Sequence, residues 1–306
     1  MTFDLSLMML NRLRRHLEKR RFETYKRDLV QTATDRNLGS VRTLCLALGP
    51  YRSYTTVTAG YIGTHPHCLA LNHGGSSVIG DPELDFIAHR RPQVTDNFLR
   101  YALALADHGL PHEAKLRPLR RRLPRAAGDG FRREPRVIFW NDAQRMARHL
   151  RRHNVHFDEL FRKEPRLRFL LTLRNPIDCA ASLVHTGLTR HLQLEPGASL
   201  QTVLEAVLRE FHWFATLEKR HPDRFFHLAP TTFDPDQAQA LARFLGVEAD
   251  PAWIARATKL FHFEQRRFHD STLTAQCRQA VERYFENLPE FGNLLLGLLS
   301  EGSPSS

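Results

Sequence analysis

The segment that most clearly indicates the fold is residues 42–56, RTLCLALGPYRSYTT. Its apolar part ends at Gly49-Pro50, and an apolar run of this length bounded by turn residues predicts a buried strand that leads into a loop. The helix-like stretch Thr55 to Thr64 follows, so the loop joins a strand to a helix. Such a turn directs free backbone N–H groups and the positive end of the helix dipole at whatever lies above the sheet, which suits an anionic group.

Short apolar runs elsewhere in the chain predict more strands, and helical patterns separate them. The further strands are His67 to Leu71, Arg136 to Trp140, Leu167 to Leu173 and Arg224 to Leu228. The helical patterns include Asp142 to His153, Pro176 to Leu188, Leu200 to Arg220 and Asp234 to Leu245. This alternation predicts an α/β fold with three α/β/α layers and a central, mainly parallel sheet. Ligands then bind at the carboxyl ends of the strands.

The composition is that of a globular protein with a strong positive charge. Of 306 residues, 42% are hydrophobic and 25% charged, which excludes disordered, collagen-like and coiled-coil classes. Lysine plus arginine number 44 against 33 for aspartate plus glutamate, a formal net charge of +11. This charge favours anionic partners such as nucleic acid, anionic lipid, sulfated or phosphorylated sugars and nucleotides. The sequence has no recognition-helix, zinc or aromatic-basic motif, so we expect no specific nucleic-acid binding.

The spacing of the cysteines and the length of the apolar runs predict whether the protein binds metal, forms disulfides or spans a membrane. The four cysteines lie far apart and form no CxxC pair, so we expect neither a metal site nor a disulfide framework. No run approaches the ~20 apolar residues that a membrane-spanning helix needs. At the N-terminus the apolar residues precede the basic ones, the reverse of a secretory signal. We expect a cytoplasmic protein, with peripheral contact at the inner face of the membrane as an alternative.

The chain divides into three predicted parts. Residues 1–37 form a basic helical segment, residues 38–300 the α/β domain, and residues 301–306 a disordered tail. Two interpretations of the first segment stay open: a helix whose apolar side packs on the main domain, or a helix that contacts a membrane surface or a partner. A second basic stretch, Lys115 to Arg136, predicts a mobile insertion, either a solvated loop or a binding site.

The loop after the first predicted strand carries residues that suit an anion. Arg52 supplies a cation, and Ser53, Thr55 and Thr56 supply hydroxyl donors. The loop is not a Walker A sequence, because GxxxxGK[ST] would place Gly-Lys before the hydroxyl residue, where Tyr54 precedes Thr55 here.

The loop after the fourth predicted strand carries a second set of such residues. Arg174 stands at the end of the strand, and Pro176 fits the first turn of the following helix. Ser182 lies two turns into that helix, so it and Arg174 can close on one anion from two sides. A surface arginine and a helix serine without a ligand are the simpler alternative.

The order of these motifs resembles a known family. Pro50 to Thr56, followed by a helix and His65-Pro66, looks like the 5′-phosphosulfate loop of sulfotransferases that use 3′-phosphoadenosine 5′-phosphosulfate (PAPS). Their pattern is roughly P-x-S-G-T-T, with Lys or Arg at x. Arg174-Asn175-Pro176 with Ser182 is similar to their 3′-phosphate site, R-[DN]-P-x-[DE]-x-x-x-S. Phe244-Leu245-Gly246 is like the F-L-G that follows the family's last core helix.

The resemblance implies a P-loop-like nucleotide-binding fold and transfer of the sulfuryl group of PAPS to a hydroxyl or amine of an acceptor. By this likeness Arg52 stands beside the bridging oxygen between sulfate and phosphate, where negative charge grows. Thr55 and Thr56, with backbone N–H groups of residues 53–56, would hold the 5′-phosphate. Arg174 and Ser182 would hold the 3′-phosphate. The acceptor, a glycan, lipid or small metabolite, is expected to be anionic because residues 115–168 are rich in arginine, and a solvated basic surface is the alternative interpretation of these charges.

The sequence also offers candidates for the catalytic base and for a basic loop that covers the nucleotide. His73, in the glycine-containing loop after the second predicted strand, is the first choice of base, and a loop histidine that binds nothing is its alternative. Asp142, after the third predicted strand, is the second choice, and its alternative role is to cap the following helix. Arg266-Arg267 would fold back over the nucleotide as in many members of the family, with a plain surface turn as the alternative.

The sequence departs from the family pattern at several positions. Tyr54 stands where the family has glycine, so it requires a different loop path or contacts a ligand. The lysine that many members carry after the third strand is absent at Asn141-Asp142, and Pro230-Thr231 replaces the usual Tyr-Glu. The alternative function is therefore a catalytically decayed protein of the same fold that binds a nucleotide or a polyanion.

Overall fold

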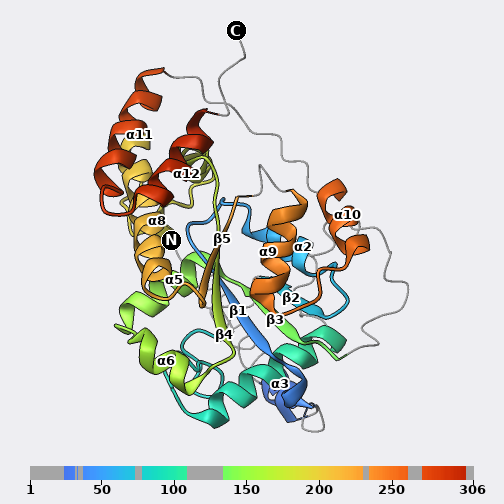
Figure 1. Cartoon of the computed structure of the whole chain (residues 1–306). Helices are drawn as coiled ribbons and strands as arrows, with labels where there is room; N and C mark the ends of the chain where they lie inside the picture. Colours follow the sequence, from blue (N-terminus) through green and yellow to red (C-terminus); the bar gives the residue numbers. More distant parts are fainter. Residues whose placement is uncertain are drawn as a thin grey trace, which may run out of the picture.

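A five-stranded sheet forms the centre of the computed structural model, which describes residues 24–31, 33, 37–72, 78–108, 134–229, 234–260 and 271–300. Every neighbouring pair of strands is parallel, in the order β2-β3-β1-β4-β5 (Figure 1). The strands are β1 (Thr43–Leu48), β2 (Cys68–Asn72), β3 (Val137–Asn141), β4 (Leu167–Thr172) and β5 (Phe225–Leu228). The predicted fold class and all five predicted strands are confirmed, with ends shifted by a residue.

The central strand β1 is buried along its whole length because both faces of the sheet are covered. Side chains alternate between the faces along a strand, so Leu44, Leu46 and Leu48 enter one hydrophobic core. Cys45 and Ala47 enter a second core on the other face. The continuous apolar run in the sequence therefore reflects a strand with two buried faces.

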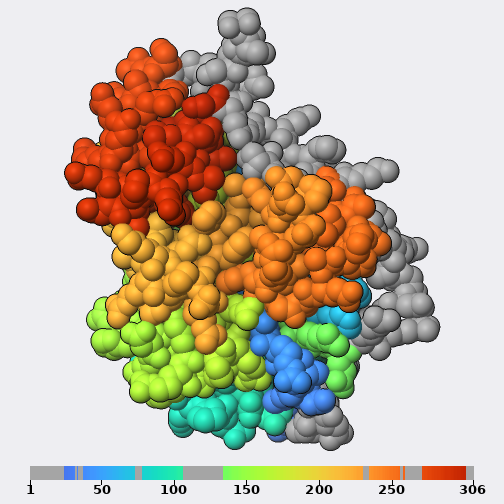
Figure 2. All heavy atoms as spheres, viewed as in Figure 1, coloured from blue at the N-terminus to red at the C-terminus, as the bar shows by residue number. Residues whose placement is uncertain are grey.

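Helices make up the two outer layers. The core that contains Cys45 is covered by α2 (Thr55–Ile62), α9 (Pro235–Leu245) and α10 (Pro251–Leu260). The core that contains Leu44 is covered by α3 (Pro92–His108), α5 (Ala143–Arg152), α6 (Phe157–Lys163), α7 (Pro176–His185), α8 (Leu200–Arg220), α11 (Ser271–Tyr284) and α12 (Pro289–Ser300). Two short 3₁₀ helices, η1 (Leu38–Ser40) and η4 (Thr189–Leu192), are also described. In the space-filling view, the residues of α8 to α12 form the yellow, orange and red part of the visible face (Figure 2).

Two predicted helix ends differ from the structure. Helix α7 ends at His185 and not at Leu188, because Gly187 has a positive φ of 64°, a conformation that ends helices. Helix α2 ends at Ile62, two residues before the predicted end at Thr64.

The strand order places two loops side by side. The chain leaves β1 toward β2 on one side of the sheet and leaves β4 toward β5 on the other, although β1 and β4 are hydrogen-bonded neighbours. A change of direction of this kind opens a crevice at the carboxyl ends of the two strands, where parallel α/β sheets bind ligands. The loops after Leu48 and Thr172 therefore meet at this crevice.

Several predicted regions lie outside the described residues: residues 1–23, most of Lys115 to Arg136, and residues 301–306. Of the N-terminal segment, residues 24–31 are helical, and Leu29 and Ala33 belong to the larger core. Within the described ranges, no helix has the length and apolar character to cross a membrane. The same ranges hold no group of three or more His, Cys, Asp or Glu residues placed to bind a metal ion.

Candidate functional site

The crevice between β1 and β4 brings together three of the predicted residues. The Nη1 atom of Arg174 donates a hydrogen bond of 3.0 Å to the backbone oxygen of Arg52. The Nε atom of Arg52 in turn donates to the hydroxyl of Ser182, at 2.9 Å. Arg174 and Ser182, which were predicted to close on one anion, thus both contact Arg52, a residue 130 positions before Ser182.

The loop before α2 is held in an uncommon backbone conformation. Arg52 and Tyr54 have positive φ angles of 72° and 60°, in the left-handed region that costs about 1–2 kcal/mol for residues other than glycine. Gly49 has a φ of 104°, and a Cβ atom there would lie 2.3 Å from Cδ1 of Leu171 on β4. Strained residues gathered in one loop are characteristic of functional sites.

Ser53 holds this loop through its side chain. The residue is completely buried, and its hydroxyl donates a 2.7 Å hydrogen bond to the backbone oxygen of Pro50. The hydroxyl is therefore engaged within the loop, contrary to the expectation that it is offered to a ligand. The predicted role of the Ser53 backbone N–H stays a prediction.

The N-terminus of α2 is suited to an anion. Thr55 and Thr56 are its first residues, and the side chain of Tyr54 at the N-cap makes no capping hydrogen bond to the helix. The N–H groups of the first turn have no acceptor within a helix, and in α7 a cap side chain satisfies them. There the oxygen of Asn175 accepts from the N–H groups of Ile177 and Asp178. The predicted anion-binding turn is consistent with this difference between the two helices.

Tyr54 lies against Arg174. The guanidinium carbon of Arg174 is 4.8 Å from the centre of the Tyr54 ring, a cation–π contact. Burial raises the pKa of the Tyr54 hydroxyl, and the positive charge of Arg174 opposes this effect. Tyr54 keeps the left-handed conformation that glycine adopts without cost, and its ring supports the neighbouring cation.

Arg174 is an almost completely buried cation, and one of its N–H donors has no hydrogen-bond acceptor in the described part of the chain. Only 9% of the residue is exposed, and its Nη2 atom lies 3.8 Å from the carboxylate of Asp178. Its buried Nε atom has no hydrogen-bond acceptor within the described part of the chain. Buried donors are almost always satisfied, so this atom points to an acceptor supplied by a ligand.

Asp142 lies at the end of β3, beside the same loop. It occupies the N-cap position of α5, but its side chain makes no capping hydrogen bond, so the alternative role as a helix cap is wrong. Its Oδ1 atom instead accepts a hydrogen bond of 3.4 Å from the hydroxyl of Tyr51. Burial raises the pKa of Asp142 to about 6, although Arg145 and the hydrogen bond from Tyr51 oppose the shift. A carboxylate with a pKa near neutrality suits general-base chemistry.

Two residues near the site were not predicted from the sequence, and three predicted residues lie outside the described part of the chain. The phenol of Tyr51 and the imidazole of His191 in η4 were not predicted, because only the fold brings residues so distant in sequence into contact. His73, Arg266 and Arg267 lie outside the described residues. Their predicted roles stay predictions.

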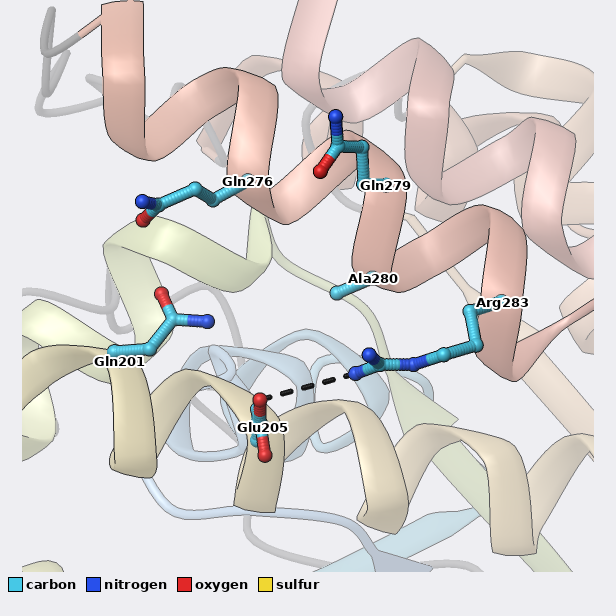
Figure 3. Close-up of a pocket in the computed structure, with 6 residues that line it drawn as sticks. All are labelled: Gln201, Glu205, Gln276, Gln279, Ala280 and Arg283. Carbon is cyan, nitrogen blue, oxygen red and sulfur yellow. Dashed lines mark ion pairs between the residues drawn. The ribbon is translucent and has the colours of Figure 1, made fainter.

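A separate pocket of about 260 Å³ lies between α8 and α11. Figure 3 shows Arg283 extending from α11 toward Glu205 on α8, with 3.8 Å between the charged groups. Its lining residues are Gln201, Glu205, Gln276, Gln279, Ala280 and Arg283. None of the predicted site residues is among them, so the pocket is distinct from the crevice at β1 and β4.

Comparison with known proteins gives matches among solved structures only. No protein-family model matches the sequence, and no curated protein does. The sulfotransferase domain from the Synechococcus PCC 7002 olefin synthase is 15% identical, with a TM-score of 0.41, over 86% of this chain and 95% of that one. Sulfotransferase STF9 from Mycobacterium avium is 17% identical, with a TM-score of 0.43, over 87% and 81%. The sulfotransferase domain from the curacin biosynthetic pathway is 11% identical, with a TM-score of 0.41, over 81% and 97%.

All three structures are sulfotransferases, the family that the sequence motifs resemble. At these identities and TM-scores the matches carry no conclusion about activity. The functional proposal therefore rests on the residues of the site.

Proposed function

We propose that the protein is a sulfotransferase that moves the sulfuryl group of PAPS to a hydroxyl or amine of an acceptor. The observation that carries this proposal is the linkage of Arg174, Arg52 and Ser182 at the crevice, next to the uncapped N-terminus of α2. One ligand with two separate phosphate groups accounts for both loops at once. PAPS, unlike ATP, carries such a second phosphate on its ribose.

The residues fit the two ends of this co-substrate. The N–H groups of residues 53–56 and the hydroxyls of Thr55 and Thr56 would hold the 5′-phosphate, since a helix N-terminus favours anions. Arg174 and Ser182 would hold the 3′-phosphate, and the buried Nε atom of Arg174 would gain its missing acceptor there. This arrangement assigns nucleotide selectivity to Arg174.

The remaining groups fit the chemical step. PAPS supplies an activated sulfuryl group, and the acceptor must lose a proton as it attacks. Asp142 would accept that proton at Oδ1 or Oδ2, because with a pKa of about 6 it is mostly ionised at neutral pH. The hydroxyl of Tyr51 holds the carboxylate in place. The exposed guanidinium of Arg52 would stabilise the charge on the departing phosphate.

Calorimetric titration with 3′,5′-ADP, the nucleotide product, tests the proposal directly. ADP and ATP serve as comparison ligands, and Arg174→Ala removes the predicted 3′-phosphate contact. Arg168→Ala is a matched control, because Arg168 is a partly buried arginine of β4 that packs over Phe244, at 5.5 Å, near the other end of the strand from the crevice loops. We expect 3′,5′-ADP to bind more tightly than ADP or ATP, and the preference to be lost in Arg174→Ala but kept in Arg168→Ala.

Equal affinity for the three nucleotides, or the same weakening in both variants, would contradict the proposal. Product formation then separates an enzyme from a decayed relative. The decayed alternative is favoured by Tyr54, which occupies a left-handed position at a cost that glycine would not carry. Selective binding of 3′,5′-ADP without PAPS-dependent sulfation of any acceptor would support that alternative.

A further inference from the structure

A group of cationic side chains adjoins the Tyr51 end of the site. The ring of His191 meets the ring of Tyr51 edge-on, with centroids 4.9 Å apart. Arg190 precedes His191 in η4, and α5 packs against η4. Arg145 and Arg148 are both on α5, one turn apart.

These arginines are exposed, and their charges act on a common neighbour. Burial and the positive charges of Arg190, Arg145 and Arg148 lower the pKa of His191, which therefore stays neutral at neutral pH. Arg145 faces the carboxylate of Asp142 at 3.9 Å. Arg148 and Arg190 have no ion-pair partner anywhere in the described ranges of the chain.

The fold alone does not account for this group. A helix C-terminus attracts basic residues, which explains Arg151 and Arg152 in the last turn of α5. Arg148 precedes that turn, so the charge of the helix C-terminus does not explain its position. Cations gathered around a neutral His191 repel one another, and an anion placed among them would remove that repulsion.

We infer that the acceptor carries an anionic group, a carboxylate, sulfate or phosphate, which Arg148 and Arg190 bind while its hydroxyl faces Asp142. This inference rests on the proposed function, since it assigns the acceptor side of the same site. Arginine binds such groups with charge-assisted, often paired hydrogen bonds, which would also orient the acceptor. His191, which follows Arg190, contacts the ring of Tyr51, and the Tyr51 hydroxyl contacts Asp142, so these two rings would line the path between the two ends of the acceptor.

Matched pairs of hydroxyl compounds test the inference on protein saturated with 3′,5′-ADP. The pairs are p-nitrophenyl glucuronide with p-nitrophenyl glucoside, and glycerol 3-phosphate with glycerol, each differing in one anionic group. Binding is measured by calorimetry for the wild type and for an Arg148→Ala/Arg190→Ala variant. An Arg162→Ala/Arg243→Ala variant is the control, because it removes the same charge at exposed positions of α6 and α9.

We expect the anionic member of at least one pair to bind at least about tenfold more tightly, the effect of one charge-assisted hydrogen bond. The Arg148→Ala/Arg190→Ala variant should lose this preference while its affinity for 3′,5′-ADP stays unchanged, and the control variant should keep both. Absence of a preference in both pairs, or its equal loss in both variants, would overturn the inference and leave nucleotide binding intact. Failure of the wild type to bind 3′,5′-ADP would overturn the proposed function and this inference with it.

Discussion

The buried carboxyl group of Asp142 should make the protein less stable at neutral pH than at mildly acidic pH. Its pKa is about 6 in the folded protein and 3.8 for an unperturbed side chain. Between about pH 4 and pH 6 the folded state therefore holds a proton that the unfolded state has released, so stability falls as the pH rises. At about 1.4 kcal/mol for each pH unit of difference, the total is about 3 kcal/mol. The loss is complete above about pH 6.

The substitution Asp142→Asn keeps the size of the side chain and removes its titration. At pH 7 the variant should be more stable than the wild type by up to about 3 kcal/mol, or roughly 5 °C in Tm. The difference should shrink as the pH falls toward 4, because the wild-type carboxyl then becomes neutral. Denaturant unfolding of both proteins at a series of pH values measures this difference in stability. The contributions of the other titrating groups are the same in both proteins and cancel in the difference.

A second buried carboxylate provides a control of opposite sign. Asp85 accepts hydrogen bonds from the N–H groups of Gly80 and Ala88 and lies 2.9 Å from a ring nitrogen of His149. These contacts lower its pKa against the effect of burial, so Asp85→Asn should destabilise the protein at pH 7. The reasoning is refuted if Asp142→Asn is no more stable than the wild type at pH 7 while Asp85→Asn behaves as expected.

Substitutions at three further positions test the loops at the crevice. Gly49→Ala should cost about 2–4 kcal/mol in denaturant unfolding, since the new Cβ meets Leu171 at 2.3 Å and φ is 104°; unchanged stability would contradict the described path of the loop. Asn175→Ala should cost about 1 kcal/mol through loss of the α7 cap, whereas Asn175→Ser, which keeps a capping oxygen, should retain most of the wild-type stability. Tyr54→Gly should relieve left-handed strain yet weaken 3′,5′-ADP binding because Arg174 loses its support, whereas Tyr54→Phe should bind normally. Equal affinity of the Tyr54→Gly and Tyr54→Phe proteins would show that the ring does not position the cation.

The sheet was predictable because each strand is a short apolar run that ends at polar or turn-forming residues. The helix Leu200–Arg220 was also predicted at its observed bounds, since its apolar residues recur at helical spacing. Helices α3, α6, α10, α11 and α12 were not predicted, although they supply core residues such as Phe98 and Trp253. Helix α6 follows α5 directly, and α10 to α12 follow α9 with no described strand between them, so the alternation with strands does not indicate them. Helix α3 lies between β2 and β3 and was missed although it follows the alternation.

Most candidate site residues could be proposed because they lie in loops that follow strands. Arg52 and Arg174 each come directly after a strand, so a parallel sheet must bring them to one edge. The role of Asp142 depends instead on its rotamer, which turns the side chain toward Tyr51 and away from the first turn of α5. The sequence pattern at an N-cap is the same whether the aspartate side chain caps the helix or turns away from it. The raised pKa of Asp142 results mainly from its burial, which only the folded structure shows.

The chain of hydrogen bonds from Arg174 through Arg52 to Ser182 makes the two phosphate positions interdependent. The hydroxyl of Ser182 accepts the bond from Arg52 and keeps its own hydrogen, so it can donate to a phosphate while Arg52 holds it in place. Substitutions at positions 52 and 182 should for this reason have non-additive effects, with an interaction energy of about 0.5–3 kcal/mol in a double-mutant cycle. The loss of either side chain would therefore alter both loops, although the two residues lie 130 positions apart in the sequence.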